Sequence, residues 1–353
     1  MSGISKEELT FRQSEELQEL RRQIAEKERI LESYKKDHGQ LEVFFNSLIN
    51  HVTPIDPLPC VYKPAKEKKG SEVVAVMQIS DGHMGAVQLP DEIEGFGEFN
   101  PELCRSRQLD FVGRVNKWVD RHRMAYTINK ITVLVTGDLI SGDIHQELQV
   151  TNAFPITVQC VEAAKVLTEQ MVHLSQNFDE VTVHFISADN HGRLTKKPQS
   201  KQEGLNSMNY IVGKLTEAYL KGIPNVLFNI YPMHEKIVRV LNRNYLLSHG
   251  HGVQGWMGKP WYGIERKIGK EAEARMDLIM NEKMKMHEIG FHKYVFGHFH
   301  VPFDTVNYSC AGSVQGTDAY DHKNGRYAEP SQPAWLVHQK HAEFGRVDFR
   351  LGG

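Results

Sequence analysis

Five short runs of apolar, mostly β-branched or aromatic residues recur along the chain and predict buried strands. They cover residues 73–79, 131–135, 181–186, 245–247 and 293–296. Runs of this length are typical of strands with both faces covered. Two stretches with apolar residues at helical spacing, 109–124 and 155–174, separate the first three runs. This alternation predicts parallel pairing and an α/β fold.

The second half of the chain carries a different pattern of short strands. Residues 226–230, 236–241 and 244–247 predict antiparallel strands joined by short polar turns, which adds a meander to the sheet system. A helix is predicted over residues 263–289. The last predicted strands, which we expect to close a second sheet, are residues 304–309, 334–338 and 346–351.

The N-terminal stretch, residues 6–48, is polar and helix-favouring. Its apolar residues follow a seven-residue repeat that is broken at Lys27 and His38, and they are Leu17, Leu20, Ile24, Leu31, Tyr34, Leu41, Phe45 and Leu48. One interpretation is a solvated helix lying on the main domain; the favoured one is a coiled coil that joins subunits into a homo-oligomer. The prolines of residues 53–59 end the helix. We therefore expect a coiled-coil segment at 1–52, a linker at 53–72 and one domain at 73–353.

The amino-acid composition argues against several classes of protein but does not indicate a substrate. The 353 residues are 40% hydrophobic and 24% charged, with a net charge of −2, so no global basic field indicates nucleic acid. The four cysteines form no CxxC pair, which argues against a zinc ribbon or a disulfide framework. No signal core or membrane-length apolar run is present, so we expect a cytoplasmic protein with no membrane partner.

Polar side chains with metal-binding chemistry follow each of the five predicted strands. In chain order the candidates are Asp81, His83, Asp138, Asn190, His249, His298 and His300. Parallel strands present such residues at their carboxyl ends, where they can converge. Seven ligands of the Asp, Asn and His type suit two five- or six-coordinate divalent ions better than one tetrahedral zinc.

This order of motifs (Asp-x-His, Gly-Asp, Asn-His, His, Gly-His-x-His) resembles the calcineurin-like metallophosphoesterase superfamily, from about residue 73 onward. The resemblance implies a four-layer α/β/β/α sandwich, two packed mixed β-sheets flanked by helices. It also implies that Asp81, His83 and His300 hold one metal, that Asn190, His249 and His298 hold the other, and that Asp138 bridges them. Manganese is the expected metal, with magnesium, zinc, iron or nickel as alternatives.

The same resemblance assigns His191 as the acid that protonates the leaving group. Two departures stand beside it: Ala188-Asp189 precede Asn190 where the family usually has glycine, and Gly192-Arg193 replace the acid that often follows the histidine. The second departure puts the family's acid–base pair in doubt. His145 and His251 could also enter the site, and we interpret both as structural or supporting residues.

The loop after His191 is the most basic in the chain. Its residues Arg193, Lys196 and Lys197 either keep the loop soluble or bind substrate phosphate. With the resemblance to exonuclease-like and phage or prophage relatives, they favour a phosphodiesterase that acts on nucleic acid. A phosphomonoesterase for a small nucleotide or phosphoprotein, and an inactive oligomeric scaffold, are the alternatives. The complete set of seven ligands argues against the scaffold.

Overall fold

The computed structural model describes residues 21–22, 24–29, 32, 72–254 and 260–352. The chain divides into two compact units, Met1–Thr53 and Pro54–Gly353. In the first unit the described residues are helical and exposed. Most of the proposed coiled coil, and the linker to residue 71, lie outside the described residues. The coiled coil and the predicted domain boundaries therefore stay predictions.

The larger sheet of the second unit has six strands and is mixed. Its spatial order is β11 (Ala342–Arg350), β10 (Ser331–His338), β1 (Glu72–Ile79), β2 (Thr127–Val135), β3 (Glu180–Ile186) and β4 (Val226–Tyr231). The strands from β1 to β4 pair in parallel, with Val76 opposite Thr132 and Val183 opposite Phe228. Strands β10 and β11 are antiparallel additions at the β1 edge.

The smaller sheet has five strands. Its order is β5 (Glu235–Val240), β6 (Arg243–Ser248), β7 (Lys293–Phe296), β9 (Tyr308–Cys310) and β8 (Phe303–Asp304). The central pairs β6–β7 and β7–β9 are parallel, whereas β5 and β8 run antiparallel to their neighbours. The carboxyl ends of β6 and β7 therefore lie at the same edge of this sheet.

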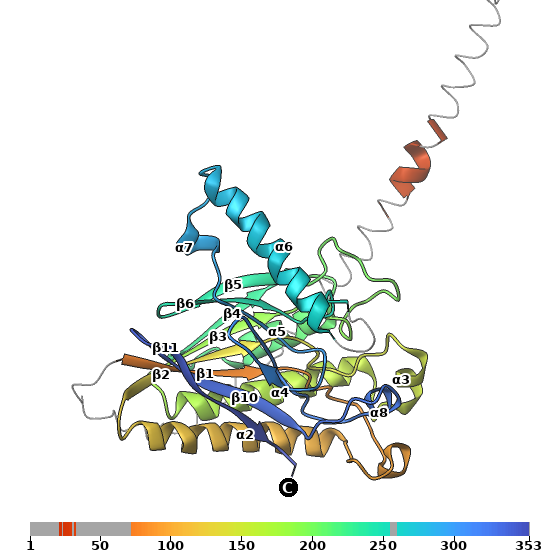
Figure 1. Ribbon diagram of the computed structural model, residues 1–353. Helices are drawn as coiled ribbons and strands as arrows, with labels where there is room; N and C mark the ends of the chain where they lie inside the picture. The colour runs from red at the N-terminus through yellow and green to blue at the C-terminus, as the bar shows by residue number, and fades with distance from the viewer. Residues whose placement is uncertain (1–20, 23, 30–31, 33–71, 255–259, 353) are drawn as a thin grey trace, which may run out of the picture. The chain divides into compact units, whose positions relative to one another are not determined.

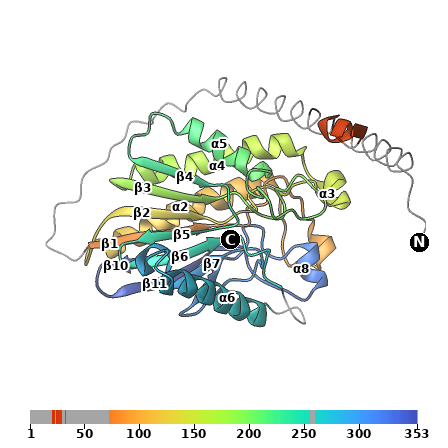
Figure 2. The same ribbon diagram turned by 90° about the horizontal axis from the view of Figure 1, so that it is seen from above.

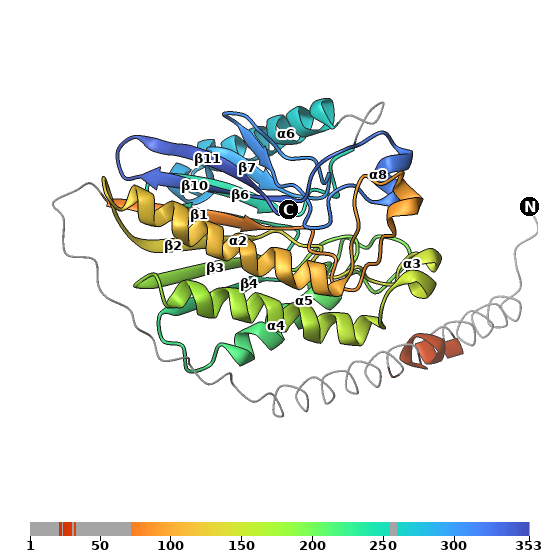
Figure 3. The same ribbon diagram turned by 90° about the horizontal axis from the view of Figure 1, so that it is seen from below.

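The two sheets pack face to face between two layers of helices (Figure 1). The core between them contains Val76, Leu134, Tyr245, Val295 and Trp335, all buried. The larger sheet is covered on its other face by α2 (Pro101–His122), α4 (Ile156–Ser175) and α5 (Met208–Tyr219) (Figure 3). The smaller sheet packs on α6 (Trp261–Met280) through Ile264, Tyr294 and Phe296. The predicted fold class, α/β with two mixed sheets flanked by helices, is confirmed.

Four short helices complete the described chain. They are the 3-10 helix η1 (Pro90–Ile93), α3 (Gln146–Thr151), α7 (Met286–Ile289) and α8 (Ala319–Lys323). Helices α3 and α8 lie at the end of the domain to which β1 points (Figure 2). No helix of the described residues is both long enough and apolar enough to cross a membrane.

Three strand assignments differ from the sequence prediction. Strand β4 does not continue into a meander with β5, because it pairs in parallel with β3 in the larger sheet. Strands β10 and β11 do not close the smaller sheet; they extend the larger one beside β1. Apolar alternation identifies a strand but not its partner, since pairing depends on contacts between segments far apart in sequence.

The helix boundaries were also partly wrong. Helix α2 begins at Pro101, eight residues before the predicted start, because Asn100 caps it by accepting from Leu103 N at 2.8 Å and proline is favoured in the first turn. The single helix predicted over residues 263–289 is two helices, since Glu282, two residues after the end of α6, takes a left-handed φ of 56°. Helix α5 was not predicted.

Candidate metal centre

The seven predicted ligands meet where the carboxyl ends of both sheets come together. Asp81 and His83 follow β1, Asp138 follows β2 and Asn190 follows β3, all in the larger sheet. The smaller sheet contributes His249 after β6, and His298 and His300 after β7. Backbone hydrogen bonds join the loops, with His83 N donating to Asp138 O at 3.0 Å. The structure thus brings together residues that are up to 219 positions apart in sequence.

Asp81, His83 and His300 form one half of this cluster, with their potential ligand atoms within 4.8 Å of one another. His300 Nε2 lies 3.1 Å from His83 Nε2 and 3.5 Å from Asp81 Oδ1. All three residues are buried. Burial lowers the pKa of His83 well below its ordinary value, and the neighbouring His191 and His300 lower it further. A neutral imidazole is the form that binds a metal.

Asp138, His249 and His298 form the other half, again within 4.8 Å. Asn190 belongs with them, because its Oδ1 lies 2.9 Å from His249 Nε2. Asp138 is also grouped with His83 and His191 at the same limit, so its carboxylate lies between the two halves. This position is the one that a bridging carboxylate would occupy.

The atoms of the second half are arranged for a cation better than for hydrogen bonds alone. His249 Nδ1 lies 2.9 Å from the Thr136 carbonyl, which can only accept, so Nδ1 carries the proton. The Nε2 lone pair of neutral His249 then faces two oxygens at 2.9 Å, Asn190 Oδ1 and Asp138 Oδ2. Opposite a neutral His249, the buried Asp138 Oδ2 accepts no hydrogen bond from any described residue. Either a second proton on His249 or a divalent cation would resolve this concentration of lone pairs, and the imidazole, amide and carboxylate donors fit a metal.

Backbone strain is concentrated in the same residues. Positive φ angles occur at Asp81 (51°), His83 (44°), Asp138 (48°), His298 (71°) and His300 (60°). Side chains in the left-handed region cost about 1–2 kcal/mol per residue relative to the ordinary helical region. Folding alone would favour glycine at such places, and residues held there against strain cluster at functional sites.

Close packing fixes the orientation of Asp81. Ser80 Oγ donates to Asp81 Oδ2 at 2.6 Å, and His298 N lies 3.1 Å from both carboxylate oxygens. Gly297 leaves the room for this contact, because a Cβ there would lie 2.2 Å from Asp81 Oδ2. The residues that follow β7 therefore hold the carboxylate of Asp81, which follows β1.

Two buried carboxylates that the sequence analysis did not assign support the cluster. Asp189 accepts from Asp138 N at 2.9 Å and Gly192 N at 2.8 Å, and also from the Asn209 amide. Its place directly before Asn190 was a sequence signal, but the pair Ala188-Asp189 was interpreted only as a departure from a family pattern. Burial and the charge of Asp138 raise the pKa of Asp189 to about 7.

Asp321 is the other supporting carboxylate. Its Oδ2 lies 2.5 Å from His300 Nδ1, and its Oδ1 lies 2.7 Å from Arg326. A ring nitrogen bonded to a carboxylate is held as the proton donor, which leaves Nε2 to face His83 and Asp81. No sequence pattern indicated Asp321, because it lies in the short helix α8, 21 positions from His300.

His191 lies beside the cluster. Its Nδ1 donates to the Ser141 carbonyl at 2.6 Å, and its Nε2 lies 4.0 Å from Asp138 Oδ2. The Ser141 carbonyl therefore orients the His191 ring, which has no acidic residue directly after it in the sequence. His145 is exposed at the start of α3, its ring 6.2 Å from that of His191.

The basic loop divides into two kinds of residue. The Arg193 guanidinium donates to the carbonyls of Asn190 at 3.0 Å and Thr195 at 3.1 Å, and it also reaches that of Lys196 at 3.4 Å, so it braces its own loop. Lys196 and Lys197 are exposed. Substrate binding by these three residues stays a prediction.

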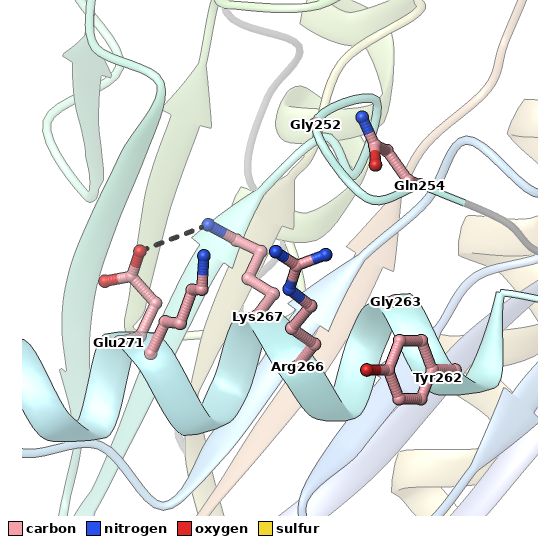
Figure 4. Close-up of a pocket in the computed structure, with 8 residues that line it drawn as sticks. Gly252, Gln254, Tyr262, Gly263, Arg266, Lys267 and Glu271 are labelled. Atoms are coloured by element: carbon pink, nitrogen blue, oxygen red, sulfur yellow. Dashed lines mark hydrogen bonds and ion pairs between the residues drawn. The ribbon is translucent and has the colours of Figure 1, made fainter.

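A pocket of about 750 Å³ lies between α6 and the loop that follows His249 (Figure 4). Gly252 and Gln254 form the loop side of the pocket. The helix side carries Arg266, Lys267 and Lys270. Lys267 is paired with Glu235 at 2.8 Å and Glu271 at 3.3 Å, whereas Arg266 and Lys270 are exposed. The pocket is therefore accessible and partly positive.

Several solved structures are similar to this chain at low sequence identity. No protein-family model matches the sequence, and no curated protein matches it. Vps29 from Entamoeba histolytica, solved with Zn²⁺, is 14% identical, with 78% of this chain and 99% of that chain covered and a TM-score of 0.29. YfcE, a phosphoesterase from E. coli, is 13% identical, with 77% and 98% covered and a TM-score of 0.30. Vacuolar protein sorting 29 from Cryptosporidium parvum is 14% identical, with 79% and 98% covered and a TM-score of 0.30.

Proposed function

We propose that this chain is a calcineurin-like metallophosphoesterase that uses two divalent cations to hydrolyse phosphodiester bonds, with nucleic acid as the substrate. The observation that supports the proposal is the Asp138 carboxylate between two histidine-containing halves, with its buried Oδ2 2.9 Å from His249 Nε2 and 4.0 Å from His191 Nε2. Asp81, His83 and His300 would hold one cation. Asn190, His249 and His298 would hold the other, with Asp138 shared between them.

The bound pair would supply the positive charge that offsets developing negative charge on a phosphoryl group. The chain's own residues provide the rest. The loops after β1 and β7 fix Asp81 through Ser80 and the His298 amide, and Asp189 fixes the Asp138 loop. These contacts are made within the chain itself, and preorganised groups of this kind stabilise developing charge.

His191 is the residue proposed to protonate the leaving oxygen. Its Nδ1–H is engaged by the Ser141 carbonyl, so Nε2 is the atom that carries and releases the proton. His191→Ala should retain both cations and slow cleavage most for esters with poor leaving groups, because only those need a proton donor. Rates on an activated nitrophenyl ester and on an alkyl ester are the measurement. Equal losses on both would remove His191 from this role.

The activity itself is tested with a substrate panel in the presence of manganese. The panel contains bis-p-nitrophenyl phosphate, p-nitrophenyl phosphate, and labelled single- and double-stranded DNA. Cleavage of the diester and of DNA supports the proposal. Cleavage of the monoester alone supports a phosphomonoesterase, and no cleavage of any member by metal-loaded protein supports the scaffold alternative.

Nucleic acid is favoured as the substrate by exposed cations in two segments that follow strand ends with candidate ligands. Lys196 and Lys197 follow the loop of Asn190, and Arg266 and Lys270 line the pocket that begins after His249. Replacing Lys196 and Lys197 by alanine should weaken DNA binding and flatten its salt dependence, since each phosphate contact releases counterions. The double variant of Lys117 and Lys340, both exposed elsewhere, is the matched control. Unchanged DNA affinity and salt slope in the test variant would favour a small substrate.

The bridging role is tested by comparing Asp138→Asn with His83→Ala. The asparagine keeps the shape but removes the charge that both cations share, so both sites should weaken together. Loss of His83 should damage mainly one site. Calorimetry with manganese separates the two cases, and two normal sites in Asp138→Asn would refute the assignment.

A further inference from the structure

A second cluster with metal-binding chemistry lies outside the seven residues described above. Glu203 comes from the loop between β3 and α5, His234 from the turn between β4 and β5, and His251 from the loop after β6. Glu203 Oε2 lies 2.9 Å from His234 Nδ1, and Glu203 Oε1 lies 2.6 Å from His251 Nε2. We call these three residues the outer cluster. Three separate segments thus place one carboxylate and two imidazoles within 4.8 Å of one another.

We propose that the outer cluster binds a divalent transition-metal cation at a site separate from the candidate metal centre. Two histidines and one carboxylate form the donor set that iron, manganese and zinc use when coordination positions remain open. The side chains are partly accessible, with exposed fractions of 15% for Glu203, 36% for His234 and 13% for His251. Water can therefore complete the coordination. This proposal rests on the outer cluster alone and does not depend on the phosphoesterase activity.

The outer cluster directs one nitrogen of each imidazole at the same carboxylate. His251 Nε2 and His234 Nδ1 both face Glu203, and these are the atoms that a shared cation would contact. Burial would raise the pKa of Glu203, but its bonds to His234 and His251 outweigh this effect and lower the pKa to about 2. Glu203 is therefore ionised at neutral pH, in the state that a cation requires. Gly252 leaves room beside the His234 ring, because a Cβ there would already lie 3.2 Å from Nε2.

The outer cluster also adjoins the candidate metal centre. The His251 ring lies 5.6 Å from that of His249 and 6.5 Å from that of His298. His251 is two positions after His249 in the same loop, and Glu203 belongs to the segment that follows Asn190. Filling the outer cluster would therefore fasten together the loops that carry His249 and Asn190, and it would add positive charge beside them.

Metal content of the full-length protein tests the proposal. Wild type, Glu203→Gln and His234→Ala are loaded with zinc, dialysed to equilibrium against a low free concentration and analysed by plasma mass spectrometry. Each variant should lose about one zinc per chain relative to wild type, because a site deprived of one of three protein ligands binds at least about tenfold more weakly. His287→Ala, an exposed histidine in α7, is the matched control and should keep the wild-type content.

Two further measurements keep the result decisive. Circular dichroism must show that the variants are folded; His234 is the less buried position, so His234→Ala gives the answer if Glu203→Gln does not fold. In Asp138→Asn, zinc that is lost on adding His234→Ala belongs to the outer cluster, whether or not the protein has phosphoesterase activity. Equal zinc content in folded His234→Ala and wild type would overturn the proposal.

Discussion

The candidate ligands were recognisable from sequence because each directly follows an apolar run. Asp81, Asp138 and His249 are examples: their types and their positions after strands are both local properties. Asp321 and Glu203 could not be found in this way. Their roles depend on contacts with His300 and His251 that only the folded chain creates, and a lone carboxylate in a loop or short helix carries no such signal.

Asp321 should control how well His300 binds a cation. Asp321→Asn removes the charge that holds the proton on His300 Nδ1, so affinity for one of the two cations should fall about 10–100-fold. Manganese titration by calorimetry measures the loss. Asp110→Asn, an exposed carboxylate on α2, is the control. If Asp321→Asn bound both cations with wild-type affinity, the support from Asp321 would be dispensable.

Cation binding should strengthen as pH rises from 7 to 9. Burial lowers the pKa of His249, but the charge of Asp138 and its contact with the ring outweigh burial, and the charges of Asp81 and Asp189 act in the same direction. Together they raise the pKa to about 9 in the cation-free protein. His249 is therefore protonated at pH 7, and a cation must displace that proton. The gain is at most about tenfold per pH unit for each proton displaced.

The raised pKa of His249 also predicts that the cation-free protein loses stability as pH rises. A raised pKa contributes stability that is complete below the unfolded value of 6.5 and is lost as pH rises through about 9. Thermal unfolding at pH 6.5 and pH 9, with and without manganese, measures both effects. Manganese should raise Tm more at pH 9. An equal effect of manganese at both pH values would contradict the assignment of His249.

The backbone strain of the site lies in the residues that follow the strands, and the position of those residues explains why the strain is tolerated. Each loop must turn its side chain toward the partner sheet within one or two residues, and positive φ at Asp81, Asp138 and His298 achieves this. Sequence patterns locate the end of a strand, but they do not give the direction of the next residue. For the same reason, the pairing of β4 with β3, and of β10 with β1, could not be predicted.

Gly297→Ala should damage the centre through the β7 end. A Cβ at this position would lie 2.0 Å from Ser80 Oγ and 2.2 Å from Asp81 Oδ2, so Asp81 must move. We expect a loss of about 1–3 kcal/mol in unfolding free energy, together with weaker cation binding. Gly269→Ala is the matched control, because its Cβ would meet nothing within 4 Å in helix α6. There alanine should stabilise by up to about 1 kcal/mol. Equal effects of the two substitutions would exclude the proposed close approach.

For the molecule as a whole, the repeated strand–helix–strand units predicted the α/β class, because such units allow few arrangements, whereas the two packed sheets were implied by the resemblance to a known superfamily. It could not assign every strand to its sheet. The sequence also did not predict the outer cluster, since Glu203, His234 and His251 lie on three segments that are far apart along the chain. Convergence of distant residues is a property of the packed layers and not of any single element.

The heptad pattern of the N-terminal segment lies entirely before the first strand of the domain. Deleting residues 1–59 should lower the oligomeric state and leave cation binding intact, because all seven candidate ligands lie in the unit Pro54–Gly353. A subtler variant, Leu17→Asp with Ile24→Asp, places charges at two heptad positions without shortening the chain, and should have the same effect. The control is Gln18→Asp with Glu26→Asp, at positions outside the apolar repeat. Light scattering gives the mass of each protein, and manganese calorimetry gives the binding. An unchanged number of chains per particle in both the truncated and the aspartate variants would contradict the coiled-coil assignment. Loss of cation binding on truncation would show that the N-terminal segment is needed for the metal centre.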